Sequence, residues 1–85
     1  MYNKYEGKDN YGKLKSEYIN NIANMNQEEL MEETERKIWL SGYANNNPRS
    51  DYHWHVDACY DEWVKREGNS PSSYKKAYNN VIESL

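Results

Sequence analysis

The apolar residues of this chain recur at helical spacing, and this periodicity constrains its fold more than any other feature. Four stripes can be traced, formed by Tyr11, Leu14, Tyr18, Ile22 and Met25; by Leu30, Met31, Thr34, Ile38 and Trp39; by Tyr52, Val56, Cys59, Tyr60 and Trp63; and by Tyr74, Ala77, Tyr78, Val81, Ile82 and Leu85. Residues three and four apart share one face of an α-helix. No segment alternates with the period of a strand. The sequence therefore predicts an all-α fold, a small bundle of four helices.

Capping residues set the expected ends of the first two helices. The first is expected over residues 10–23, where its apolar stripe runs. Asn26 can cap the second helix, with Glu29 three residues later as its capping-box partner. That helix is expected to run to about Ser41, and Gly42 to end it.

Turn residues divide the second half of the chain in the same way. Residues 45–48, three Asn followed by Pro, predict a loop. Ser50 or Asp51 can cap a third helix through about residue 67, which Gly68 ends. Ser70 as N-cap and Pro71 at the first helical position then predict a fourth helix.

The chain is short enough to form one domain with one modest core, since it has 85 residues. It contains nine Tyr, three Trp and no Phe, so aromatic side chains must supply much of the buried area. Residues 1–9 are polar and include Gly7, and we expect them to fray. Residues 10–85 are expected to form the single helical domain.

Charge and composition exclude several classes of function. The net charge of -3 argues against nucleic-acid binding, which needs clustered Lys and Arg. On the second helix, Glu32 with Arg36 and Glu33 with Lys37 are expected to form i,i+4 pairs on an exposed face. No stretch is apolar enough to insert into a membrane, and a single cysteine indicates no disulfide framework. A cytoplasmic location is therefore expected.

Both histidines and the cysteine lie in one segment. His55 and Cys59 are four residues apart, a spacing that can present two ligands to zinc, and His53 with Asp57 repeats it. A closed zinc site needs four ligands, and the chain has no further Cys or His. Cys59 also lies on the apolar stripe, where a free thiol packs as a small hydrophobe. We therefore expect no metal, no cofactor and no catalytic Cys–His pair, and hence no enzyme.

The carboxyl half of the chain resembles the acyl-CoA-binding protein family, a family of four-helix bundles. The residues that carry this resemblance are Tyr60-Asp61-Glu62-Trp63, Gly68, Ser70, Ala77-Tyr78, Val81-Ile82-Glu83 and Leu85. The resemblance implies a similar fold. It also implies a divergent acyl-CoA binder that uses Arg36, Lys37 and Tyr78. Of the family's ligand-gripping pattern on the second helix only Lys37 remains, and Cys59 replaces a second family lysine.

The preferred functional prediction rests instead on aromatic residues outside the helical stripes. Tyr43 and Trp54 are candidates for binding a partner, together with the neighbouring His53, since Tyr and Trp are enriched at binding hot spots. Abundant Asn, Lys and Tyr are typical of phage and viral accessory proteins. The sequence therefore predicts a non-enzymatic protein that binds another protein, such as a phage factor inhibiting a host protein, with acyl-CoA binding as the alternative.

Overall fold

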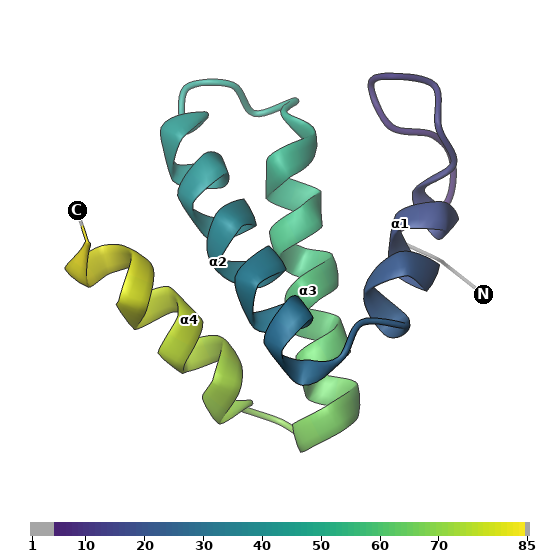
Figure 1. Cartoon of the computed structure of the whole chain (residues 1–85). Coiled ribbons are helices and arrows are strands. Elements are labelled where there is room, and N and C mark those ends of the chain that lie inside the picture. The colour runs from purple at the N-terminus through teal and green to yellow at the C-terminus, as the bar shows by residue number, and fades with distance from the viewer. Residues whose placement is uncertain (1–4, 85) are drawn as a thin grey trace.

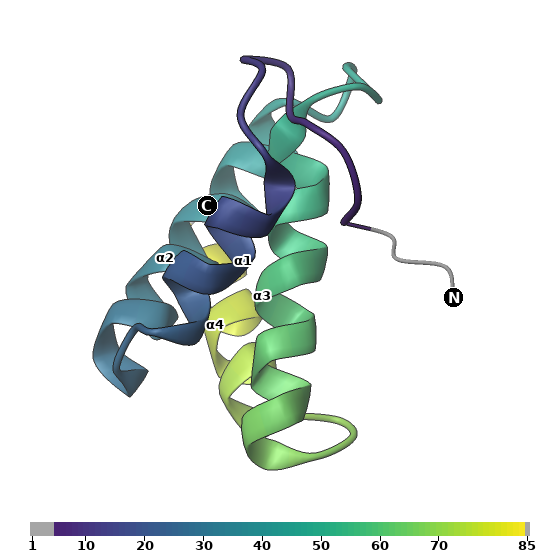
Figure 2. The ribbon, with the colours of Figure 1, turned by 90° about the vertical axis from the view of Figure 1, so that its right-hand side faces the viewer.

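The computed structural model describes residues 5–84 and contains four α-helices, α1 (Lys15–Ala23), α2 (Gln27–Tyr43), α3 (Asp51–Glu67) and α4 (Ser72–Glu83). Helices α2 and α3 lie side by side and run in opposite directions, with α1 and α4 on opposite sides of this pair (Figure 1; Figure 2). Over residues 5–84 the only β-type pairing is an isolated bridge between Lys8 and Leu14. The all-α prediction is confirmed. None of the helices described is long and apolar enough to cross a membrane.

Helix α1 begins at Lys15, not near Asn10 as the apolar spacing suggested. A tight turn replaces the expected first turns of helix, because the Asp9 carboxylate accepts hydrogen bonds from the backbone of Tyr11 and Lys13, both at 2.9 Å. Gly12 adopts a φ of 82°, which a right-handed helix cannot contain. As a result Tyr11 and Leu14, expected to face inward, are 86% and 51% exposed.

The amino-terminal segment contacts α3. The Tyr5 hydroxyl donates a hydrogen bond to the Asp61 carboxylate. The backbone N–H of Asn10 donates to Asp51 over 3.1 Å, and its side-chain amide donates to the carbonyl of Arg49 over 2.8 Å. Of residues 1–9, for which we predicted fraying, the first four lie outside the described residues.

The expected capping box opens α2. The Asn26 side chain accepts from the Glu29 N–H at 2.8 Å, and the Glu29 carboxylate accepts from the Asn26 N–H at 2.9 Å. Gly42 does not end this helix as predicted. It stays helical, and the Ala44 N–H still donates to the Leu40 carbonyl over 2.9 Å. Because α2 continues to Tyr43, this residue lies on the same helix face as Trp39, one turn beyond it.

The boundaries of α3 follow the prediction, and the start of α4 differs from it. Ser50 caps α3, and Gly68 ends it with a φ of 86°. Ser70 does not cap α4, because its own φ is 58°, and Pro71 occupies the cap position without a side-chain hydrogen bond. The Glu67 carboxylate instead accepts from the backbone of the first turn of α4 over 3.0 Å.

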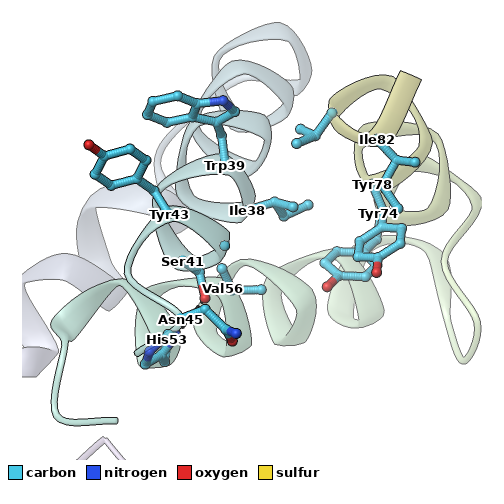
Figure 3. Close-up of a pocket in the computed structure, with 12 residues that line it drawn as sticks. Ile38, Trp39, Ser41, Tyr43, Asn45, His53, Val56, Tyr74, Tyr78 and Ile82 are labelled. Atoms are coloured by element: carbon cyan, nitrogen blue, oxygen red, sulfur yellow. Dashed lines mark hydrogen bonds between the residues drawn. The ribbon is translucent and has the colours of Figure 1, made fainter. Parts of the chain in front are cut away.

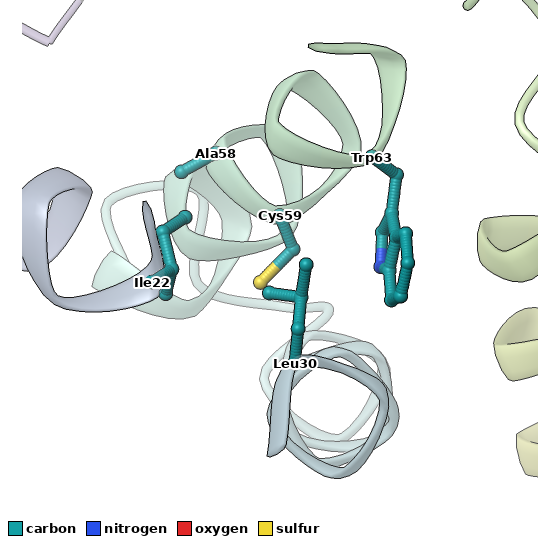
Figure 4. Packing of buried hydrophobic residues seen from close by; sticks show 5 residues of the cluster. All are labelled: Ile22, Leu30, Ala58, Cys59 and Trp63. Atoms are coloured by element: carbon teal, nitrogen blue, oxygen red, sulfur yellow. The ribbon is translucent and has the colours of Figure 1, made fainter. Parts of the chain in front are cut away.

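The main core lies where α1, α2 and α3 meet. Its fully buried members are Ile22, Leu30, Ala58, Cys59 and Trp63 (Figure 4). A smaller cluster of Ile38, Ala77 and Val81 joins α4 to α2. Trp63 is buried as predicted, with 1% exposure, but the residue of α4 that packs against its cluster is Tyr74. Tyr78, which belongs to the apolar stripe predicted for this helix, is 46% exposed.

Candidate functional site

An apolar groove lies between the carboxyl end of α2, the start of α3 and α4. Its volume is about 570 Å³, and its lining residues are Ile38, Trp39, Ser41, Gly42, Tyr43, Asn45, His53, Val56, Tyr74, Tyr78, Val81 and Ile82. In Figure 3 the aromatic rings of α2 and the side chains of α4 form its two walls, with Ile38 and Val56 between them. A concave site of this size with apolar walls is typical of a binding site.

The α2 wall of the groove carries a pair of stacked aromatic rings. Trp39 and Tyr43 lie one helical turn apart, with ring centroids 5.5 Å apart and planes inclined by 16°. Trp39 is 47% exposed, which corrects the prediction that it extends the buried stripe of α2. Tyr43, a predicted partner-binding residue, is 82% exposed. The two rings therefore present a large apolar surface that the core does not use.

The α4 wall is also more exposed than its stripe suggested. Tyr78 and Ile82 were expected to face inward, yet they are 46% and 49% exposed. Only Ala77 and Val81 are buried on this helix, against Ile38 of α2. Helix α4 lies at the edge of the bundle (Figure 1). No other described helix covers the row formed by Tyr78 and Ile82.

Two hydrogen bonds made by the His53 ring border one end of the groove. Nδ1 of His53 lies 2.6 Å from the Ser41 hydroxyl, and Nε2 lies 2.9 Å from the carbonyl oxygen of Asn47. A carbonyl can only accept, so Nε2 carries a proton, and in the neutral imidazole Nδ1 accepts from Ser41. Both ring nitrogens of His53, a predicted partner-binding residue, are therefore engaged within the chain. The Ser41 oxygen keeps lone pairs that can accept a hydrogen bond from a partner.

Trp54, the remaining aromatic candidate, lies away from the groove on the α1 side of α3. Its ring is 5.4 Å from that of Tyr18 and 6.2 Å from that of Tyr5, and its indole N–H donates to Asp51 over 2.9 Å. The Lys15 ammonium lies 5.2 Å from the indole. The structure thus brings Tyr43 and His53 to one groove and places Trp54 in a half-buried cluster elsewhere.

A polar cluster lies beside the core between α1, α2 and α3. The Glu33 carboxylate is buried, and accepts from the Tyr18 hydroxyl at 2.7 Å and pairs with Lys37 at 2.9 Å. We predicted the Glu33–Lys37 pair on an exposed face; the pair forms, but its carboxylate is buried. Arg36 approaches Glu33 at 3.6 Å rather than Glu32. Burial tends to raise the pKa of Glu33, but the hydrogen bonds and cations around it outweigh burial and lower that pKa.

Of the residues of the predicted acyl-CoA site, Arg36 and Lys37 meet at Glu33, and Tyr78 lies apart from them. The Lys37 ammonium is held by Glu33 and lies 5.5 Å from the Tyr18 ring, so it faces α1. Tyr78 lines the groove on the other side of α2, beside α4. Arg36 lines a separate hollow with Trp39. A phosphate at Lys37 would therefore compete with a carboxylate that is already in place.

In the segment that contains both histidines and the cysteine, Cys59 and His55 pack towards the interior, whereas His53 lies at the groove. Cys59 is buried, and burial raises the pKa of its thiol, which disfavours a reactive thiolate. The His55 ring stacks on Tyr18 at 4.2 Å, and burial followed by the charge of Lys37 lowers its pKa to about 4. Its Nδ1 is buried without a hydrogen-bond partner. Within residues 5–84 no three His, Cys, Asp or Glu side chains are grouped to hold a metal ion.

No known protein family, curated protein or solved structure matches this chain. The groove therefore has to be interpreted from its own residues. Sequence reasoning found Tyr43 and His53, and named Tyr78 only through the acyl-CoA-binding resemblance. It missed Trp39 and Ile82, because these fall on the apolar stripes. The spacing of Trp39 and Tyr43, four residues apart at the end of an acidic helix, was the available signal.

Proposed function

We propose that this chain is a non-enzymatic binding protein whose partner is another protein, held at the groove between α2 and α4. The observation that carries the proposal is the stacked Trp39–Tyr43 pair at the rim of an apolar groove, with exposures of 47% and 82%. Large exposed apolar surfaces beside a concavity are typical of interaction sites, and Trp and Tyr dominate binding hot spots.

The chemistry of the groove supports binding rather than catalysis. Catalysis requires a group that can activate a nucleophile or transfer a proton beside the bound substrate. The one thiol is buried away from the groove, and both nitrogens of His53 are occupied. The aromatic rings can bury area on a partner with little loss of side-chain entropy, because each has only two rotatable bonds.

The composition extends the proposal to the kind of protein. Abundant Asn, Lys and Tyr in a short acidic chain favour a phage or viral accessory factor that acts in the cytoplasm by inhibiting a host protein. A short chain can inhibit by occupying a surface that the host protein needs. The proposed phage or viral role rests on composition, whereas the proposed protein binding rests on the groove.

A divergent acyl-CoA binder is the second candidate, favoured by the sequence resemblance and by Tyr78 in the wall of an apolar groove. The position of Lys37 counts against it, because Glu33 holds this lysine at 2.9 Å on the far side of α2. An acyl chain could occupy the groove. None of the described residues that line it is a Lys or Arg that could bind the coenzyme's phosphates.

Site-specific photo-crosslinking tests the proposal. A photoreactive side chain introduced at position 43 should crosslink to one dominant protein in lysate of a candidate host cell. The same group at Glu17, which is exposed on α1, is the matched control and should yield only background. Equal crosslinking from both positions would contradict a binding site at the groove.

A further inference from the structure

The apolar groove adjoins a second hollow that is acidic. This hollow is lined by Glu32, Glu35, Arg36, Trp39, Asn80, Val81 and Ser84. Trp39 and Val81 line both depressions, so they meet at the point where α4 crosses α2. A partner segment longer than the groove therefore reaches the carboxylates of α2.

One face of α2 combines the two surfaces into a stripe. Glu28, Glu32, Glu35, Trp39 and Tyr43 follow one another at intervals of four, three, four and four residues, which places them on one face of the helix. The stripe is acidic at its amino end and aromatic at its carboxyl end. We refer to these five residues as the α2 stripe.

Among the described residues, the carboxylates of the α2 stripe form no ion pair, although Arg36 lines the same hollow. Over residues 5–84 neither Glu28 nor Glu32 forms an ion pair, and Glu35 accepts only a neutral hydrogen bond, from the Asn80 amide at 2.8 Å. The neighbouring cations of α2, Arg36 and Lys37, both turn to the buried Glu33 instead. The stripe thus offers carboxylates and aromatic faces together, and both attract cations.

The groove itself adds a further preference for hydrogen-bond donors. While His53 is neutral, the Ser41 hydroxyl donates a hydrogen bond to its Nδ1, so the remaining capacity of the hydroxyl is to accept. On the opposite wall, α4 contributes Lys75, which lines a shallow hollow that shares Tyr74 and Tyr78 with the groove. Cations of a partner are therefore favoured along the α2 side and disfavoured beside Lys75.

We infer that the partner presents a basic amphipathic helix, whose apolar face fills the groove while Lys or Arg side chains meet the α2 stripe. This inference rests on the proposed function. Two helices form the walls, which suits a helix laid into a groove, and the described part of the chain offers no sheet edge for strand addition. The acidic stripe disfavours anionic partners such as nucleic acid.

Fluorescently labelled synthetic peptides test the inference by anisotropy. Three helical peptides share one leucine face and carry Lys, Gln or Glu on the polar face. The Lys peptide should bind most tightly and lose affinity with added salt. Trp39→Ala should weaken it at least about tenfold, as expected at a hot spot. The double variant Glu32→Gln/Glu35→Gln should weaken it roughly two- to fivefold, as expected for exposed charge pairs.

Variants with a comparable charge change away from the α2 stripe distinguish binding at the groove from general attraction of a basic peptide to an acidic protein. Glu17→Gln on α1 removes the same charge away from the groove and should leave the affinity unchanged. Lys75→Gln removes the cation of the α4 side and should not weaken binding. An equal loss from Glu17→Gln and from the double variant would overturn the inference, because it would reflect net charge alone.

The remaining outcomes distinguish this inference from the proposed function. Equal binding of the Gln and Lys peptides, lost in Trp39→Ala, would overturn the basic partner and leave protein docking at the groove standing. A chain that sediments as a dimer and dissociates in Trp39→Ala would also overturn it, by making a second copy the occupant. Failure of every peptide to bind would overturn the inference, and crosslinking from position 43 would then decide the proposed function separately.

Discussion

The indole Nε1 of Trp63 donates a hydrogen bond to the hydroxyl of Thr34 over 2.9 Å, and joins α3 to α2 inside the core. The Thr34 hydroxyl in turn donates to the Leu30 carbonyl over 2.6 Å. Both side chains are fully buried, so the indole N–H depends on the Thr34 hydroxyl for a partner. A buried Trp in an aromatic-rich core thus fixes the register of the two central helices.

Removing the Thr34 hydroxyl should leave the indole N–H of Trp63 buried without a partner. Thr34→Val keeps the shape of the side chain and should cost about 1–3 kcal/mol in the free energy of unfolding, measured by urea denaturation. The variant Thr34→Val/Trp63→Phe removes both partners, and should be more stable than the sum of the two single losses implies. Strictly additive losses would contradict a specific bond between these side chains.

Arg66 should hold α1 on the bundle. Its guanidinium donates to the carbonyls of Met25 at 2.7 Å and Ile22 at 3.2 Å, near the end of α1, and pairs with Glu62 at 2.9 Å. Arg66→Ala should cost about 1–3 kcal/mol, since it leaves Glu62 and the carbonyls unpaired. Hydrogen exchange should accelerate at the amides of α1, whereas Lys65→Ala, the exposed neighbour, should leave exchange unchanged. Identical exchange in both variants would refute this role.

Acid should destabilise the fold through His55. A histidine in the unfolded chain titrates with its ordinary pKa of 6.5, whereas burial and then Lys37 lower the pKa of folded His55 to about 4. The folded state resists the proton, so stability that is complete above pH 6.5 falls as the pH drops towards 4. The melting temperature should decrease over this range, and the decrease should be smaller in His55→Gln. The same slope in His55→Gln and in the wild type would contradict the assignment to His55.

Calorimetry should separate the two functional candidates. A long-chain acyl-CoA should bind weakly, hardly better than the matching free fatty acid, because Lys37 is held by Glu33 and no cation lines the groove. Any affinity should come from the acyl chain, at about 0.8 kcal/mol per buried methylene. Tight binding that disappears in Lys37→Ala and Tyr78→Phe would establish the acyl-CoA candidate instead.

The helices and the groove differ in how far the sequence could predict them. Periodicity predicted four helices because every helix buries one stripe, and Asn26, Ser50 and Gly68 act as caps through local bonds. The start of α1 was missed because the turn around Asp9 has no periodic signature. The groove was missed because periodicity identifies an apolar face without showing how much of it neighbours cover. Helix α4 packs mainly against α2 and to a smaller extent against α3, which leaves Ile82 exposed.

We propose that the Trp39–Tyr43 pair binds the partner and contributes little to folding. Quantitative capture of the partner from host lysate tests this role. The double variant Trp39→Ala/Tyr43→Ala should melt close to the wild-type temperature and yet retain less than about a tenth of the captured partner. Tyr11→Ala is the matched control, since Tyr11 is 86% exposed but lies outside the groove, and it should capture as the wild type does. Undiminished capture by a folded double variant would contradict a binding role for Trp39 and Tyr43.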